Sequence, residues 1–174
     1  MFRSLPCPHL LLFAIAFLAS SVAAQQRDVS AAELHRITNE ASYEFNNLKM
    51  YKDEEAWRGK IVAFSGYIQK TPVIAKTKGE YLQIAGNTAN GAVNVVVFLD
   101  GPIPTTDNYG NQVPTITPGM DVRVFLQVRS LMNFTSESGV MMNLPTGDAL
   151  LIFPKDDYSM THPVWASSAL IRRR

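Results

Sequence analysis

The sequence predicts a mainly β protein, a five-stranded OB-type Greek-key barrel that follows one amphipathic N-terminal helix and, before it, a signal peptide. Two observations support this fold class. Apolar residues recur every three or four positions up to Leu48, as on one face of a helix, and from Trp57 the period changes to two. No helical pattern separates the short strands that follow. Since parallel strands need long crossover connections, a small antiparallel barrel or sandwich is favoured.

Length and composition place the chain among single-domain proteins that fold around an apolar core. It has 174 residues, of which 47% are hydrophobic and 18% charged, the balance of a folded domain rather than of a disordered segment. Its 16 basic residues stand against 15 acidic ones. A dedicated duplex-DNA binder would normally carry a basic excess, so that function class is disfavoured.

Residues 1–24 have the three parts of a secretory signal peptide. Arg3 supplies a positive charge, Leu10 to Ala19 (LLLFAIAFLA) is an apolar run, and Val22-Ala23-Ala24 presents small residues to a signal peptidase. The apolar run is too short to span a bilayer, which takes about 20 helical residues. We therefore expect cleavage before Gln25 and export, with an uncleaved anchor as the alternative.

Cleavage changes the inventory of chemical groups. It removes Arg3, so that 16 minus 1 leaves 15 basic residues against 15 acidic ones, and it removes Cys7, the only cysteine. A mature disulfide is then impossible. Because small secreted eukaryotic domains usually carry disulfides, we expect a bacterial periplasmic or secreted protein. No other apolar stretch is long enough to cross a membrane, so no transmembrane segment is expected in the mature chain.

Residues 28–51 are predicted to form the N-terminal helix. Ser30 and Glu33 fit a capping box at its start, in which the serine hydroxyl accepts from the third helical amide. One apolar stripe at steps of three and four follows, made of Leu34, Ile37, Ala41, Phe45 and Leu48. The stripe predicts a single helix of about 20 residues with one buried face.

Residues 54–154 are predicted to form the barrel, and residues 155–174 a C-terminal tail. Gly66, inside the first strand, indicates a bulge or a sharp bend. The connection between Asp100 and Gly119 contains four prolines, and a loop of that length is either a recognition loop or a linker. The predicted strands are Ile61–Gln69, Tyr81–Ala85, Ala92–Leu99, Asp121–Ser130 and Ala149–Phe153, with Val140–Leu144 as a short additional strand.

Three short segments carry a further pattern: residues 57–62 (WRGKIV), 66–68 (GYI) and 118–124 (PGMDVRV). In these segments the chain resembles small exported bacterial OB-fold proteins, the tRNA-anti-like or periplasmic OB-fold group. The resemblance covers roughly Glu54 to Phe153. It implies an OB barrel and fixes no ligand, because one fold hosts many functions.

The sequence holds few of the groups that catalysis or metal binding needs. His35 and His162 are the histidines left after cleavage, and no residues have the spacing of zinc ligands, so neither a metal nor another cofactor is expected. No Gly-x-Ser-x-Gly elbow is present, and we expect a protein that is not an enzyme. The alternative is a secreted OB-type nuclease or hydrolase, for which the candidate residues are Asp100, Asp121, Arg123 and Arg129.

Binding is the favoured role, because OB barrels bind oligomers across their second and third strands and two flanking loops. Exposed tyrosines stack on sugar rings or bases, and lysines follow negative charge. The same residue types also serve as half-buried packing tyrosines and as lysines that keep strand edges soluble. The predicted ligand-binding residues are Tyr67, Lys70, Lys76, Lys78, Tyr81, Gln83, Arg123 and Arg129.

The favoured hypothesis is a non-enzymatic exported OB-fold module for binding or assembly in the bacterial cell envelope, with a glycan, peptide or protein partner. For an exported chain without net charge, nucleic acid is a less favoured partner, and a nucleic-acid-binding OB protein stays as an alternative. A third hypothesis is an oligosaccharide-binding subunit of a ring-forming complex. The apolar tail, residues 164–171, either packs on the barrel or docks a partner or an anionic membrane.

Overall fold

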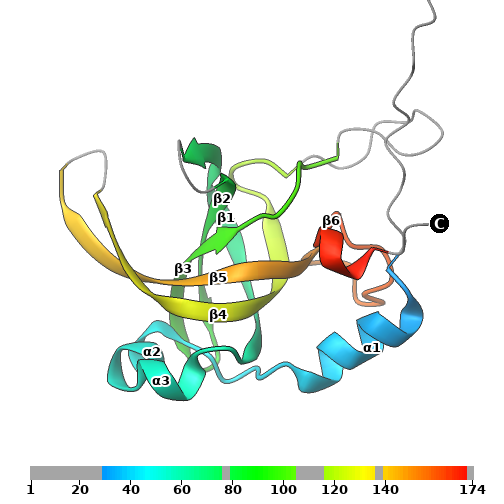
Figure 1. Cartoon of the computed structure of the whole chain (residues 1–174), viewed down its shortest axis with the longest axis horizontal. Coiled ribbons are helices and arrows are strands. Elements are labelled where there is room, and N and C mark those ends of the chain that lie inside the picture. Colours follow the sequence, from blue (N-terminus) through cyan, green and yellow to red (C-terminus); the bar gives the residue numbers. More distant parts are fainter. Residues whose placement is uncertain (1–28, 76–78, 105–115, 136–138, 172–174) are drawn as a thin grey trace, which may run out of the picture.

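The computed structural model describes residues 29–75, 79–104, 116–135 and 139–171, with the backbone alone for residues 70–75 and 79–80. The predicted signal peptide and the three terminal arginines lie outside the described residues. Within these ranges the chain forms a β-barrel with short helices at one end and along one side (Figure 1).

Five strands close the barrel. The antiparallel pairs run β3–β2, β2–β1, β1–β4 and β4–β5, and β5 returns to pair with β3 in parallel through Thr146–Asp148 and Val96–Phe98. This order is that of the five-stranded Greek-key OB barrel, so the predicted fold class is confirmed. The strands are β1 (Ile61–Ala75), β2 (Gly79–Thr88), β3 (Gly91–Phe98), β4 (Asp121–Thr135) and β5 (Met141–Pro154).

β1 belongs to both halves of the barrel, and its pairing partner changes next to Gly66. Up to Tyr67 it pairs with β4, and from Tyr67 onward it pairs with β2. A Cβ added at Gly66 would lie 2.6 Å from the carbonyl oxygen of Ala85, and one added at Gly86 would lie 2.9 Å from the Cα of Gly66. The strands therefore cross so closely that only glycine fits. The close approach is the role that a glycine inside a strand often has, and the register shifts of β1 lie further on, between Ile68 and Val73, so a bulge or bend at Gly66 stays a prediction.

The inward-facing residues of the strands form the main core, and two short helices close one end of it. α2 (Asn47–Lys52) contributes the buried Met50, and α3 (Glu54–Trp57) contributes Trp57, which packs edge-to-face on the buried Phe45 with 5.5 Å between ring centroids. The strands contribute mainly aliphatic side chains, among them Val62, Ile68, Leu82, Ile84, Val95, Val97, Val124, Leu126 and Ile152.

The single helix predicted over residues 28–51 is wrong, because the chain breaks it into two. The capping box at Ser30 does start a helix, but α1 (Ala31–Glu40) is only ten residues long. After it, the backbone of Ser42 bonds to β1, donating to the carbonyl of Ile61 at 2.9 Å. Asn46 then caps α2 by accepting from the amide of Lys49. Strand pairing and a new cap thus replace the helical hydrogen bonds, and Leu48 of the predicted apolar stripe is 61% exposed.

α1 and the C-terminal tail cover the outer side of β4 and β5 and of the start of β1, at Ile61 and Ala63. Ile37 of α1 packs there with Phe125 and Phe153, and the three side chains are buried in a second apolar cluster. The tail forms β6 (Trp165–Ala166), which pairs with β5, and η1 (Ser168–Leu170). Of the two roles predicted for the tail, packing on the barrel describes residues 164–171.

β4 and β5 continue past the barrel as a hairpin, which we call the arm (residues 130–135 and 141–145; Figure 1). The sequence predicts a separate short strand over Val140–Leu144 and a final strand over Ala149–Phe153. In the structure both belong to β5, which pairs with β4 over its whole length. No helix among the described residues has the length and apolar character that a membrane crossing needs.

Asp100 fastens the tail to the barrel. Its carboxylate accepts from the hydroxyls of Ser167 and Ser168, each at 2.8 Å, and from the backbone amide of Ser168 at 3.0 Å. Partial burial of Asp100 raises its pKa, but these hydrogen bonds outweigh that effect, so the pKa lies below the usual 3.8. Nearby, the buried Trp165 donates its indole N–H to the carbonyl oxygen of Gly101 at 3.3 Å.

Gly66→Ala is predicted to destabilise the fold by about 2–3 kcal/mol, because the added methyl group collides with the backbone of Ala85 and one of the two strands must shift. The measurement is the free energy of unfolding in urea. The matched control is Gly119→Ala, where φ is +84° but no atom lies within 4 Å of the added Cβ. A cost at Gly66 no larger than that at Gly119 would contradict the close crossing.

Asp100→Asn is predicted to destabilise the protein at neutral pH and to lose this effect in acid. A carboxylate whose folded-state pKa is depressed adds stability above its unfolded pKa, and this stability disappears as the pH falls through the folded pKa. The difference in unfolding free energy from wild type is therefore expected to be constant above about pH 5 and to shrink in stronger acid.

The control for Asp100 is Asp156→Asn, because the Asp156 carboxylate makes no hydrogen bond or ion pair with another described residue. This variant is expected to unfold with nearly the free energy of wild type at every pH. If the difference in unfolding free energy between Asp100→Asn and wild type does not change with pH, the Asp100 carboxylate is not the group that holds the tail on the barrel.

Candidate ligand-binding face

The outer side of β1, β2 and β3 is the part of the barrel wall that neither α1 nor the tail covers (Figure 1). Side chains alternate across these strands, so Leu82 and Ile84 point into the core while their neighbours Gln83 and Ala85 point outward. Tyr67 is the largest exposed side chain on this part of β1, with 43% of its surface accessible. We call this surface the binding face.

The centre of the binding face consists of two neighbouring rows of side chains, each made of residues that are register partners across the strands. Tyr67, Ala85 and Asn94 face one another across β1, β2 and β3, and Gln83 lies opposite Val96 in the next row. The amide of Gln83 donates to the side-chain oxygen of Asn94 at 3.0 Å, and that of Gln69 lies 3.4 Å from the Tyr67 hydroxyl. The centre is therefore an exposed aromatic ring among carboxamide groups.

α2 holds the edge of the binding face through Asn47. Its side chain accepts from the backbone amide of Asn94 at 2.9 Å and donates to the carbonyl of the same residue at 3.0 Å, as a neighbouring strand would. One helical turn later, the hydroxyl of Tyr51 donates to the carbonyl of Asn143 on the arm at 2.7 Å. Asn47 and Asn94 are absent from the residues predicted from the sequence. The signal that could have found them is an asparagine in the middle of an otherwise apolar strand.

The end of the binding face nearest the arm is apolar. Tyr81 and Phe98 contact each other edge-to-face with 6.5 Å between ring centroids, and both belong to a third cluster with Val96 and Leu144. The partly buried arm side chains Met132, Phe134 and Met142 pack against this cluster.

Arg129 lies beside the apolar end, where its guanidinium makes two contacts. Its guanidinium forms an ion pair with Asp148 on β5 at 2.6 Å and lies 4.9 Å from the ring centroid of Phe98. The ion pair joins neighbouring strands, since Asp148 pairs with Gln127 of β4, whereas Phe98 comes close through the β3–β5 pairing that puts it opposite Asp148.

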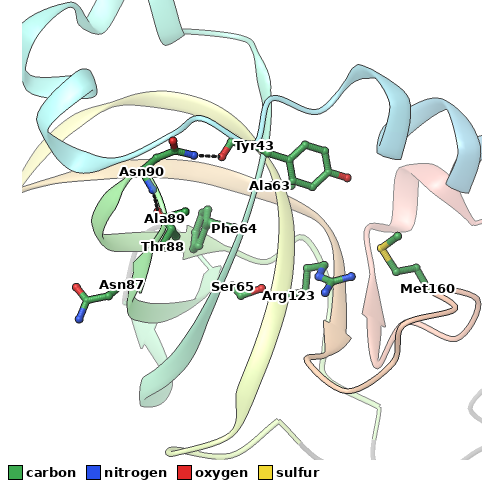
Figure 2. Close-up of a pocket in the computed structure, with 10 residues that line it drawn as sticks. All are labelled: Tyr43, Ala63, Phe64, Ser65, Asn87, Thr88, Ala89, Asn90, Arg123 and Met160. Carbon is green, nitrogen blue, oxygen red and sulfur yellow. Dashed lines mark hydrogen bonds between the residues drawn. The ribbon is translucent and has the colours of Figure 1, made fainter.

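At the opposite end, beyond Gly66, the face continues into an open groove of about 580 Å³ (Figure 2). Ser65 of β1 and Arg123 of β4 are register partners on its floor, and Asn87 of β2 lies on the other side of Ser65 in Figure 2. One wall is held by Asn90, which donates from its side chain to the carbonyl of Tyr43 at 2.9 Å. The remaining lining residues are Ala63, Phe64, Thr88, Ala89 and Met160.

The structure distributes the predicted ligand-binding residues over three places. Tyr67 and Gln83 lie together at the centre, Tyr81 and Arg129 lie at the apolar end, and Arg123 lies in the groove. The backbone of Lys70 pairs with Gln83, so Lys70 is on the same strand pair, and its side chain is not described. Lys76 and Lys78 lie outside the described residues, and a role for each of the eight residues stays a prediction.

The residues named for the nuclease alternative are also dispersed. Asp100 fastens the tail, whereas Asp121 begins β4 and forms an ion pair with Lys155 at 3.7 Å. Among the described residues, no group of three or more His, Cys, Asp or Glu side chains is arranged to hold a metal ion.

The comparisons with known proteins find similarity among solved structures alone. No family model matches the chain, and no curated protein matches it. Among solved structures, a mitochondrial single-stranded DNA binding protein from S. cerevisiae is similar, with 17% sequence identity. The match covers 53% of this chain and 88% of that chain, with a TM-score of 0.29. The OB assignment of the barrel therefore depends on its own strand order and closure.

Proposed function

We propose that this protein is a non-enzymatic binding module that recognises a glycan on the outer face of β1, β2 and β3. The observation that carries the proposal is the exposed Tyr67 ring set among the carboxamides of Gln69, Gln83 and Asn94. An aromatic face packs on the apolar side of a sugar ring, and carboxamides both donate to and accept from sugar hydroxyls. OB barrels bind oligosaccharides on this same surface.

This face is less suited to binding a peptide than to binding a glycan. Peptides that bind by strand addition need an unpaired strand edge. Here Tyr67 of β1 has β4 on one side and β2 on the other, Ala85 of β2 has β1 and β3, and the backbone of Asn94 bonds to Asn47. A ligand at the centre therefore meets side chains alone, which suits a partner recognised through its hydroxyl groups.

Single-stranded nucleic acid is the alternative, and it needs cations along the path of the phosphates. Arg129 is already paired with Asp148, and the charged residue opposite Tyr67 on β4 is the acidic Asp121. Among the side chains that the structure describes at the centre of the face, none is charged. This distribution favours an uncharged sugar over a phosphate backbone at the centre.

We further propose that the module works in the bacterial cell envelope after export. The support is the signal-peptide pattern of residues 1–24, the zero net charge of the chain from Gln25 onward, and the resemblance to small exported bacterial OB-fold proteins. In that compartment polysaccharides are abundant partners for a side-chain surface of this kind.

Tyr67→Ala is predicted to weaken glycan binding about tenfold or more, because it removes the aromatic platform and leaves the fold intact. The chain from Gln25 onward would be screened on an array of bacterial and plant oligosaccharides, and the best-bound sugar titrated by calorimetry. The matched control is Tyr158→Ala, since Tyr158 is 83% exposed in the tail and is not among the residues of the face or the lining of the groove. Its affinity is expected to equal wild type.

Three outcomes would contradict the proposed function. Equal loss of affinity in both tyrosine variants would remove the face as the site. Binding of single-stranded DNA or RNA oligonucleotides with no sugar bound on the array would favour the nucleic-acid alternative. Turnover of a bound sugar, or cleavage of an oligonucleotide in the presence of Mg²⁺, would remove the non-enzymatic part.

Export predicts a specific mature N-terminus. When the full chain is expressed in a bacterium, N-terminal sequencing of the periplasmic fraction is expected to begin at Gln25. The control is Ala24→Arg, which replaces the small residue directly before the cleavage site and is expected to leave an unprocessed chain. A full-length, unprocessed wild-type chain confined to the cytoplasm would contradict export.

A further inference from the structure

The groove beyond Gly66 differs in charge from the centre of the binding face. Of its ten lining residues, Arg123 carries a charge, and the other nine are polar or apolar neutral residues. The two parts nevertheless belong to one surface. Arg123 faces Ser65 and Asp121 faces Tyr67 on the same strand pair, so Arg123 and Tyr67 are diagonal neighbours. Such neighbours lie about 7–8 Å apart.

Four arginines lie in the part of the chain that the structure describes, and Arg123 is the one of them without a carboxylate partner. Arg36 pairs with Glu33 and Glu40, Arg58 with Glu54 and Glu55, and Arg129 with Asp148, whereas Arg123 forms no ion pair with any described residue. The nearest acidic residue on its side of β4 is Asp121, which pairs with Lys155.

Arg123 offers an anion a positive charge that no described carboxylate neutralises. The residue is half-buried on the outer side of β4. Its planar fork of N–H donors matches the two oxygens of a carboxylate. Ser65 lies beside it and Asn87 lies on the far side of Ser65, and neither side chain makes a hydrogen bond with another described residue (Figure 2). One positive charge and two polar side chains without hydrogen-bond partners among the described residues thus line the groove.

We infer that the groove is a subsite for a hexuronic acid, the carboxylated residue of a glycan whose neighbouring sugar packs on Tyr67. This inference rests on the proposed function and names its ligand class. Arg123 receives the carboxylate, while Ser65 and Asn87 bond to ring hydroxyls. The adjacent sugar reaches the exposed tyrosine because the two positions are diagonal neighbours. The glycan is therefore acidic and lies across β1 at Gly66.

The test compares sugars that differ in the carboxylate alone. Short oligomers of galacturonic acid and of mannuronic acid, their methyl esters, and uncharged glucose oligomers would be titrated into the chain from Gln25 onward. Wild type is expected to bind at least one acid oligomer about tenfold or more tightly than its ester, since hydrogen bonds to a charged group are the strong ones. Added NaCl is expected to weaken binding of the acid and not of the ester.

Arg123→Gln is expected to remove the preference for the acid and to leave the affinity for the ester unchanged. Arg123→Lys is expected to keep part of the preference, because it keeps the charge and loses the fork. The matched control is Arg58→Gln, whose guanidinium is paired with Glu54 and Glu55 and lies outside the binding face and the groove; it is expected to keep the full preference. Thermal melts of each variant verify folding.

The two proposals fail in distinguishable ways. Sugar binding that depends on Tyr67 but shows no preference for the acid overturns the uronate subsite and leaves the proposed function standing. A preference that survives Arg123→Gln also overturns the subsite. Absence of binding to every acid, ester and neutral sugar overturns both. Tighter binding of a sulfated or phosphorylated sugar than of any uronate, again dependent on Arg123, overturns the carboxylate assignment.

Discussion

The structure depends on the close crossing of β1 and β2 at Gly66 and Gly86. A Cβ on Gly86 would lie 2.9 Å from the Cα of Gly66, so the two backbones touch where other residues would hold them apart. This contact lets one strand pair first with β4 and then with β2, which turns a sheet into a barrel. It also divides the outer surface in two, because Tyr67 lies on one side of Gly66 and Ser65 with Arg123 lies on the other.

The position of the binding face follows from how the chain covers its other apolar surfaces. α1 and the tail bury the outer side of β4 and β5 and of the start of β1, and α2 and α3 close one end of the main core. The arm packs against the apolar end of β2 and β3 around Phe98. What stays uncovered is a strip of amides and one tyrosine that continues into the groove. An exposed aromatic ring among carboxamides is the kind of surface that a sugar covers on binding.

The barrel could be predicted from the sequence because it depends on local patterns: a period of two, β-branched strands and a glycine inside the first strand. The break in the N-terminal helix could not. Asn46 is a poor helix former, but its decisive contacts are remote, since its amide donates to the carbonyl of Asn90 far along the chain. The candidate site shows the same limit. Arg123 and Arg129 look equivalent on one alternating strand, and only the register of β5 on β4 brings Asp148 to one of them.

The measurement that tests the proposed binding face most directly is an NMR titration of the isotopically labelled chain with the sugar that it binds best. The largest amide shifts are expected to fall on Tyr67, Ala85 and Asn94 and to continue through Ser65 to Arg123, as one contiguous track past Gly66. Shifts concentrated on α1 and the tail, with that track unchanged, would contradict a ligand site on the outer face of β1, β2 and β3.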